Sequence, residues 1–391
     1  MRPSACAKGG PLSRASEGWR SSPQKTVVAA LLGLVVLAGA GALLVAWLGL
    51  YNVAASSGHW PVVERFLRFG MENSVKARAS GEPAPPLDDD DLIRLGAGHF
   101  HAGCAFCHGA PGTPISPVAA GMMPPPPDLK QRVGHWRDQE LFRIVKHGIK
   151  YAGMPAFPVL ARDDEVWAVV AFLRRLPVLD EAGYRALAAG EVEEEPQSGQ
   201  EIATGEASEE GAIGACARCH GARAGPASRL VPSLHGQPRE MLAEALKSYA
   251  SRERQSGVMQ TITAGLTEQS ISRLASYYAG LPPVAQRPLA TEPDAARMER
   301  GRKLAEEGEV TGEIPACLSC HAPGRSPLYP RLAGQSARYL AGQLHVWKSG
   351  LNDRTALGAI MAPIARRLSA DQIADVAAFL ASQPVADEAR R

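Results

Sequence analysis

The sequence Cys-x-x-Cys-His occurs three times in this chain of 391 residues, at 104–108, 216–220 and 317–321. These motifs use all but one of the seven cysteines. In this pattern the two thiols can form thioether bonds to a haem, and the histidine that follows can ligate its iron. We therefore predict three covalently attached haem c groups. The attaching residues are Cys104, Cys107, Cys216, Cys219, Cys317 and Cys320, and the first iron ligands are His108, His220 and His321.

Zinc sites, disulfides and a redox-active dithiol are the other interpretations of such cysteine pairs. A structural zinc site needs a second pair of ligands, whereas these pairs lie roughly a hundred residues apart. A thioredoxin-like dithiol follows a strand in a βαβ unit, and no such pattern surrounds the motifs. Haem attachment is the interpretation that fits all three motifs.

An uncharged run at 27–50 is long enough for one bilayer span of about 20 residues. Basic residues remain in the cytoplasm, so the chain after this run should lie outside. The basic residues before it are Arg2, Lys8, Arg14, Arg20 and Lys25. We predict a single-pass anchor in a bacterial inner membrane, with the haem domains in the periplasm.

A cleaved signal peptide is the alternative to this anchor. Its apolar core would be about 7–15 residues long and would end at an Ala-x-Ala-like site. The run here is longer, and 52–55 is a poor cleavage site. The segment 60–69 can form an amphipathic helix near the bilayer surface.

The sequence after the apolar run repeats itself around the three motifs. In each repeat the motif is followed by a Pro-x-Leu triplet, then a methionine, then a closing helical pattern. The triplets are 127–129, 232–234 and 330–332, and the closing patterns are 168–177, 273–282 and 375–384. In the third pattern Ser369 and Gln372 form a capping box, and Ile373, Val376, Ala377 and Leu380 form an apolar stripe.

We predict an all-α fold with one transmembrane helix followed by three haem domains in tandem. The stretch 191–210 is rich in acidic residues and has no basic one, which is typical of a solvated linker. The expected segments are a cytoplasmic tail (1–25), a transmembrane anchor (26–50), a connecting segment (51–86), a first haem domain (87–185), an acidic linker (186–210), a second haem domain (211–285) and a third haem domain (286–391).

Each repeat offers a methionine as the second axial ligand. Met361 is the only methionine after His321, and Met259 and Met154 precede the closing patterns of their own repeats. A thioether in this position raises the reduction potential and closes the iron to small molecules. A lone methionine is otherwise core filler, but its place in three aligned repeats favours a ligand.

The competing side chains have weaker positions. Met241 lies within a helical pattern at 240–249 and should be part of the core, whereas Met122 and Met123 lie too close to the attachment motif. A histidine could also replace a methionine in the first repeat. The histidines there are His99, His101, His135 and His147, and His235 and His345 in the later repeats should be surface or satisfied core residues.

The Pro-x-Leu triplets suggest how the motif histidines are oriented. A ligating histidine usually donates its other ring N–H to a carbonyl, which fixes the ring and makes it more basic. Pro127, Pro232 and Pro330 can supply that carbonyl. The alternative is that each triplet is a simple turn.

These residues resemble the class I c-type cytochromes, in which a few helices wrap one haem ligated by His and Met. The third repeat is similar to the two-domain dihaem cytochromes c at 330–335, 339–340, 343–344 and 348–350, and the second repeat matches more weakly at 232–237. The second repeat lacks, at 248–252, the glycine that the third has at Gly350. The first repeat is similar to single-haem membrane-linked cytochrome domains at 107–112, 124–127 and 146–149.

The resemblance implies an electron-transfer protein rather than an enzyme. Its donor would be a quinol-oxidising respiratory complex or a dehydrogenase, and its acceptor a terminal oxidase or a soluble cytochrome. An alternative is the electron-acceptor subunit of a periplasmic alcohol- or sugar-type dehydrogenase. A haem enzyme such as a peroxidase needs an open sixth position, which a methionine beside each iron would close. We expect no small-molecule substrate, and a net charge of +2 gives no support for nucleic-acid binding.

Overall fold

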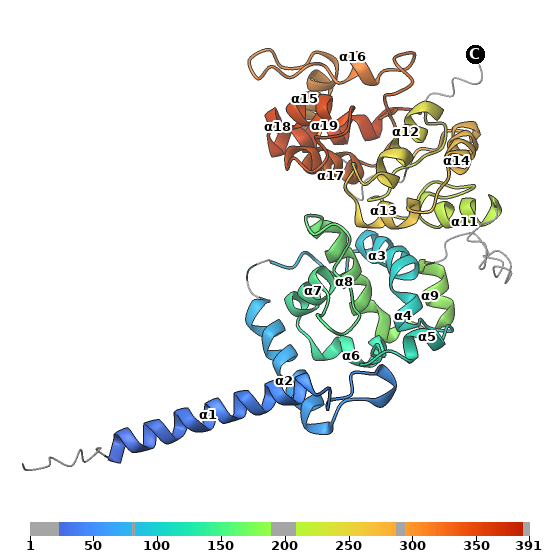
Figure 1. Cartoon of the computed structure of the whole chain (residues 1–391). Helices are drawn as coiled ribbons and strands as arrows, with labels where there is room; N and C mark the ends of the chain where they lie inside the picture. Colours follow the sequence, from blue (N-terminus) through green and yellow to red (C-terminus); the bar gives the residue numbers. More distant parts are fainter. Residues whose placement is uncertain (1–22, 80, 82, 189–208, 287–293, 386–391) are drawn as a thin grey trace, which may run out of the picture. The chain divides into compact units, whose positions relative to one another are not determined.

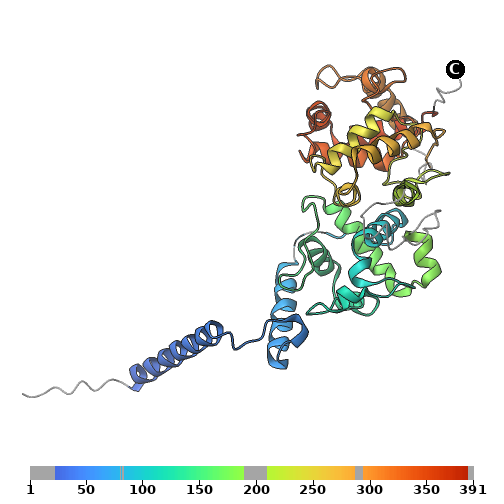
Figure 2. The same cartoon turned by 45° about the vertical axis from the view of Figure 1, so that its right-hand side comes forward.

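The computed structural model describes residues 23–79, 81, 83–188, 209–286 and 294–385 (Figure 1). Most of the predicted cytoplasmic tail and of the acidic linker lies outside these ranges. The described residues form helices and isolated β-bridges, with no sheet, as both views show (Figures 1 and 2). The predicted all-α class is therefore confirmed. The chain forms two compact units, Met1–Gly58 and His59–Arg391.

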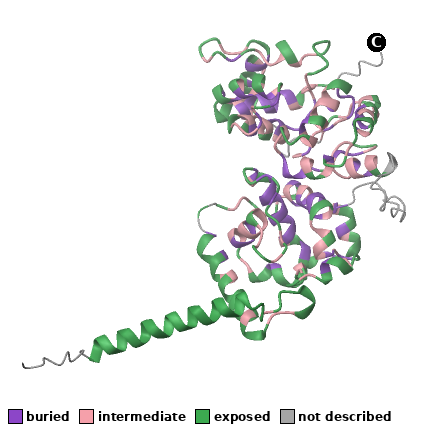
Figure 3. Ribbon diagram, viewed as in Figure 1, coloured by how far each residue is buried: buried purple, intermediate pink, exposed green. Residues whose placement is uncertain are grey.

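The first compact unit contains the apolar helix α1, Pro23–Trp47. By length and composition this helix can cross a membrane, and none of its residues is buried (Figure 3). It carries no acidic residue in its first turn and no basic residue in its last turn. The structure therefore confirms the apolar helix that the sequence predicts, with bounds shifted by a few residues from 26–50.

The second compact unit begins with α2, Pro61–Arg78, and a helical bundle around the first motif. Its longer helices are α3 (Asp90–Gly103), α7 (Asp138–His147), α8 (Asp163–Arg175) and α9 (Glu181–Ala188). Helices α3 and α8 cross in the centre, where a Cβ on Gly96 would lie 1.9 Å from the carbonyl oxygen of Ala168. Phe100 and Phe172 are fully buried beside this crossing and contact each other. The bundle thus needs glycine at position 96 because the two backbones nearly touch there.

The third repeat contains the same crossing between α15 (Ala295–Glu306) and α19 (Ala370–Ser382). A Cβ on Gly301 would lie 2.2 Å from the carbonyl oxygen of Asp375. The predicted capping box of α19 is present, since Ser369 and Gln372 bond each other's backbone N–H, and its predicted stripe is buried. Helices α17 (Ala337–Lys348) and α18 (Gly358–Arg367) complete this bundle.

The second repeat is built from α11 (Glu209–His220), α12 (Arg239–Ala250), α13 (Gly257–Thr263) and α14 (Glu268–Gly280). Here the motif forms the end of α11 itself instead of following a separate helix. Its buried apolar cluster is small and centres on Leu242, Ala275 and Tyr278. The described helices of this repeat therefore leave much of its interior open.

Short helices connect these elements. They are α4 (Ala105–His108), α5 (Pro117–Ala120), α6 (Leu129–Arg132) and α16 (Leu318–His321), with 3-10 turns at Ala55–Ser57, Val133–His135 and Leu176–Val178. The closing helices α8, α14 and α19 occur where the sequence predicts them. The exact domain boundaries remain a prediction.

Gly96→Ala should destabilise the protein by about 1–3 kcal/mol, because the added methyl group would overpack the α3–α8 crossing. Gly70→Ala is the matched control, since Gly70 lies within α2 and a Cβ there meets nothing within 4 Å. The control should be neutral or stabilising by up to about 1 kcal/mol. Thermal or denaturant unfolding measures both variants, and equal stability of the two would contradict the close crossing.

Candidate haem sites

Each motif histidine lies within hydrogen-bonding distance of the proline carbonyl predicted for it. Nδ1 of His220 lies 2.9 Å from the Pro232 oxygen, and Nδ1 of His321 lies 2.9 Å from the Pro330 oxygen. In the first repeat the corresponding distance, from His108 to Pro127, is 3.2 Å. The prediction that these prolines orient the histidines is confirmed in all three repeats.

This hydrogen bond selects one tautomer of the ring. A carbonyl oxygen can only accept, so Nδ1 must carry the proton and Nε2 keeps its lone pair. Burial lowers the pKa of His108, His220 and His321, although the bond to the proline carbonyl acts in the opposite direction. Each ring is therefore neutral near pH 7 and presents Nε2 in the form that binds a metal.

The first thiol of each motif is held in its protonated form by the fold. Burial raises the pKa of Cys104 and of Cys216 to about 12 and that of Cys317 to about 11. Because the thiolate is the reactive species, these thiols are poor nucleophiles once the chain has folded.

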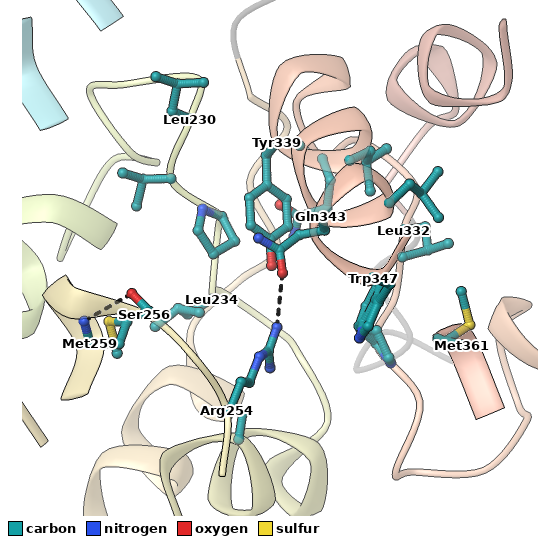
Figure 4. A pocket seen from close by; sticks show the side chains of 18 of the residues that line it. Leu230, Leu234, Arg254, Ser256, Met259, Leu332, Tyr339, Gln343, Trp347 and Met361 are labelled. Atoms are coloured by element: carbon teal, nitrogen blue, oxygen red, sulfur yellow. Dashed lines mark hydrogen bonds between the residues drawn. The ribbon is translucent and has the colours of Figure 1, made fainter. Parts of the chain in front are cut away.

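The second and third motifs open into one continuous cavity of about 830 Å³. Both cysteines and the histidine of each of these motifs line it, together with the predicted ligands Met259 and Met361. Figure 4 shows these two methionines on opposite sides of Arg254 and Gln343, whose side chains are hydrogen-bonded at 3.1 Å. Most of the lining is apolar. Within the described residues the hydroxyl of Tyr278, which is buried in this wall, has no hydrogen-bond partner.

The two predicted methionine ligands lie near the starts of short helices. Met259 is in α13, where its backbone N–H donates to Oγ of Ser256 at 3.1 Å (Figure 4). Met361 is in α18, whose first residue, Gly358, donates its N–H to Oγ1 of Thr355 at 2.9 Å. Ser256 caps α13 and so fixes the start of the helix that carries Met259, whereas the N-cap residue of α18 makes no side-chain cap hydrogen bond.

Met241 packs against the apolar cluster of the second repeat, as predicted, although it also lines the cavity. It lies in α12, which confirms the helical pattern at 240–249. The side chain of Met122 contacts a residue distant in the sequence, because its methyl group lies 2.1 Å from where a Cβ on Gly153 would be. It therefore packs against the loop that carries Met154.

The first motif lies apart from the shared cavity, and its methionine is presented by a tight loop. Ile149 and Met154 form an isolated antiparallel bridge, in which the Ile149 N–H donates to the Met154 carbonyl at 3.1 Å. Gly148 has a φ of 62°, and a Cβ there would lie 2.4 Å from the carbonyl oxygen of Met154. Glycine is needed at this position for both reasons.

Two glutamines exchange hydrogen bonds between the second and third repeats. Nε2 of Gln237 donates to the carbonyl of Arg331 at 2.9 Å, and the Arg331 N–H donates to Oε1 of Gln237 at 2.9 Å. In the same way Gln335 donates to the carbonyl of Ser233 at 2.7 Å and accepts from its N–H at 3.0 Å. Arg331 and Ser233 are the middle residues of the two Pro-x-Leu triplets. Each repeat thus holds the loop that orients the other repeat's histidine.

Known proteins match the chain in several parts. The family model described as cytochrome c oxidase, cbb3-type, subunit III matches residues 91–173, and the cytochrome c model matches residues 298–384. A thiosulfate dehydrogenase electron acceptor from Thiomonas intermedia (strain K12) is 36% identical over 174 residues, which make up 44% of this chain and 79% of that protein.

Two further relatives agree with these matches. The thiosulfate dehydrogenase electron acceptor of Stutzerimonas stutzeri (strain A1501) is 35% identical, over 43% of this chain and 78% of that protein. Cytochrome c4 of Thiocapsa roseopersicina is 33% identical, over 45% of this chain and 90% of that protein. The chain belongs to the class I c-type cytochromes. It is therefore an electron-transfer protein that carries covalently attached haem c.

The residues of this cytochrome fit that cofactor. The cavity holds thiols and a neutral histidine at each of two motifs, and its walls are largely apolar. When bound, haem would supply a one-electron couple, and the motif histidines would hold its iron in a cavity with largely apolar walls. Arg254 and Tyr339 also line the cavity, and side chains of these types can bind carboxylates.

Sequence reasoning missed the polar groups that join the repeats. The buried carboxylate of Asp91 accepts from Nε of Arg229 at 2.8 Å and from Nη1 of Arg338 at 2.6 Å. These three side chains come from the first, second and third repeats. Asp91 carries only the signal of an acidic residue in the first turn of a helix. No local pattern could have identified its distant partners.

Three of the other histidines, His99, His101 and His235, contact neighbouring residues. His99 packs on the ring of Phe157, and Nδ1 of His101 lies 2.9 Å from the hydroxyl of Tyr184. His235 is buried and its Nε2 lies 3.3 Å from the Gly221 carbonyl, but its Nδ1 has no partner among the described residues, so it is not the fully satisfied core residue expected. His345 is exposed, as expected.

The buried His99 should make stability depend on pH. Burial lowers its pKa to about 4 from 6.5, so between these values the unfolded chain binds more protons than the folded one. The free energy of unfolding should therefore fall as the pH falls through this window and stay constant above it. His99→Leu should reduce the slope by up to about 1.4 kcal/mol per pH unit.

His345→Gln is the control, because it removes an exposed histidine. Denaturant unfolding of the two variants and of the wild type between pH 4.5 and 7.5, a range set by the pKa of about 4 and the usual value of 6.5, gives the slopes. Equal slopes for all three proteins would show that His99 is not held neutral by the fold.

Proposed function

We propose that this chain is a membrane-anchored carrier of three haem c groups, which accepts electrons in the periplasm and passes them to a respiratory chain. The observation that carries the proposal is the shared cavity, in which two complete sets of predicted ligands meet. A third motif with its own proline-bonded histidine is added by the first repeat. A chain with several such sites in one compact unit is suited to relaying electrons.

The proposed axial pairs are His108 with Met154, His220 with Met259, and His321 with Met361. In each pair the histidine is fixed by a proline carbonyl, which leaves Nε2 for the iron. In the second and third pairs the methionine lies on a helix that lines the same cavity, and in the second pair Ser256 caps that helix. A methionine at each iron argues against a haem enzyme such as a peroxidase, which needs an open position.

The donor is proposed to be a periplasmic dehydrogenase. Two relatives are named as thiosulfate dehydrogenase electron acceptors, so a thiosulfate dehydrogenase is the first donor to consider. A quinol-oxidising complex or an alcohol- or sugar-type dehydrogenase is the alternative. The acceptor would be a terminal oxidase or a soluble cytochrome.

Helix α1 is proposed to remain in the membrane as the anchor. It is 25 residues long and carries no charged residue after Lys25, which matches one bilayer span. Helix α2 follows soon after it in the chain and exposes Val62, Phe66 and Phe69 along one stripe. An apolar stripe of this kind suits the interface of the same bilayer.

If the anchor is retained, the mature protein should keep its N-terminal segment and resist extraction from membranes by salt or alkali. N-terminal sequencing of the mature protein and mass measurement of the intact chain decide this. A mature protein that starts after Leu50 would show that α1 is a cleaved signal sequence.

Met361→Ala should leave the third haem attached, because attachment depends on Cys317, Cys320 and His321. The iron should become high-spin or bind water, and its potential should fall, since a thioether favours the reduced state. Met361→His should stay low-spin but also have a lower potential. Near-infrared charge-transfer bands and a redox titration compare the variants with the wild type.

Met241→Leu is the matched control, because Met241 lines the same cavity but packs in the apolar cluster of the second repeat. All methionine–iron bands should survive in this variant. If Met361→Ala also kept every band and every potential, Met361 would be core packing only.

The proposed donor can be tested with purified proteins. The oxidised full chain in detergent should be reduced by catalytic amounts of a thiosulfate dehydrogenase when thiosulfate is added, and haem absorbance reports the reduction. The chain with thiosulfate alone is the control, because a carrier without its own catalytic site should stay oxidised. Reduction without the dehydrogenase would contradict the carrier assignment, and reduction only by an alcohol or sugar dehydrogenase would favour the alternative donor.

A further inference from the structure

The segment before α13, the helix that carries Met259, is hydrogen-bonded to both the first and the third repeat. The N–H of Gln255 donates to Oδ1 of Asn352 in the third repeat at 2.6 Å. Its carbonyl accepts from Nη1 of Arg162 in the first repeat at 2.9 Å. Ser256, the next residue, caps α13 by accepting the N–H of Met259. The position of Met259 therefore depends on groups outside its own repeat.

A buried carboxylate of the first repeat accepts two further hydrogen bonds from this segment. Glu165 lies in α8 and is 4% exposed. Its Oε1 accepts from Oγ of Ser256 at 2.6 Å, and its Oε2 accepts from the N–H of Gly257 at 2.7 Å. Ser256 thus stands in a relay, because its hydroxyl donates to Glu165 and accepts from Met259.

The same carboxylate is held in place by Arg162. Nη1 of Arg162 lies 2.8 Å from Oε1 of Glu165, and its Nε and Nη2 bond the exposed Asp164. Burial raises the pKa of Glu165, but all of its partners in these contacts donate hydrogen bonds, which favours the carboxylate form. Removing a partner would leave a buried charge uncompensated, which would be strongly destabilising.

Apolar packing follows the polar contacts. A Cβ on Gly257 would lie 2.3 Å from the ring of Phe157, which leaves room for no residue but glycine. Phe157 closes the loop that presents Met154, and Gly257 begins the helix that presents Met259. The methionine-bearing segments of the first and second repeats therefore pack directly on each other.

We propose that Glu165 is a positioning residue for the methionine ligand of the second haem, so that the first repeat sets the reduction potential of the second. Glu165 acts through Ser256 and Gly257, which fix the start of α13 and hence the thioether of Met259. The inference rests on the proposed function, because it takes Met259 as the ligand of that iron.

The alternative is that Glu165 affects the second haem only through its charge. The two possibilities predict different effects of Glu165→Asp on the potential of the second haem. Glu165→Asp keeps the charge but is too short to reach both Ser256 and Gly257. A positioning role predicts a weaker methionine–iron bond and a lower potential of the second haem, whereas a purely electrostatic role predicts no loss.

The experiment is a redox titration of the full chain, followed by the near-infrared methionine–iron bands. Met259→Ala first identifies the band and the potential that belong to the second haem. At the wild-type midpoint potential of the second haem, Glu165→Asp should raise the ratio of oxidised to reduced second haem at least threefold. Only the methionine–iron band of the second haem should weaken. Bands of the first and third haems in the same sample show that the chain has folded.

Asp164→Asn is the matched control, since Asp164 is exposed and shares Arg162 but touches neither Ser256 nor Gly257 in the contacts above. It should leave the second band unchanged. Ser256→Ala should also lower the potential of the second haem. It provides the test if Glu165→Asp fails to fold. The double variant should lower the potential by less than the sum of the two single changes, because Glu165 and Ser256 share one hydrogen bond.

Two negative results are distinguishable. If Met259→Ala removes a band but Glu165→Asp and Ser256→Ala match the Asp164→Asn control, the positioning role is overturned while the ligand assignment stands. If Met259→Ala leaves every band intact, the ligand assignment itself is wrong and the inference falls with it.

Discussion

The hydrogen bond from each motif histidine to a proline carbonyl is the interaction on which the sites depend. It fixes the proton on Nδ1 of His108, His220 and His321 and so leaves Nε2 available for iron. Burial keeps the rings neutral, because it lowers the pKa of all three histidines. The loop that carries each proline must therefore be held firmly, and most of the remaining structure can be understood as holding it.

In the second and third repeats this support is mutual. Gln237 and Gln335 each bond the backbone of the opposite Pro-x-Leu loop in both directions. The two repeats also share one cavity, which is lined by residues of both. The first repeat joins them through Asp91 and Glu165, which are buried carboxylates with partners in the later repeats. The contacts favour folding of the repeats as one compact unit.

The sequence predicted the parts of this arrangement that depend on local pattern. The closing helices, the capping box at Ser369 and the proline carbonyls follow from short-range rules and occur as expected. The hydrogen bonds of Gln237 to Arg331 and of Glu165 to Ser256 could not be predicted. The partners lie 94 and 91 positions apart in the sequence, so no local pattern links them. Helix α11 continues through its motif, whereas a separate short helix carries the motif in the other two repeats.

The central claim is that every haem of this chain has histidine and methionine as axial ligands. Proton NMR of the reduced full chain tests it most directly, because the haem ring current shifts the methyl resonance of a bound methionine far upfield. The account predicts three such resonances, which single substitutions assign to Met154, Met259 and Met361. Fewer than three, or a resonance lost on substitution of Met122 or Met241 instead, would contradict it.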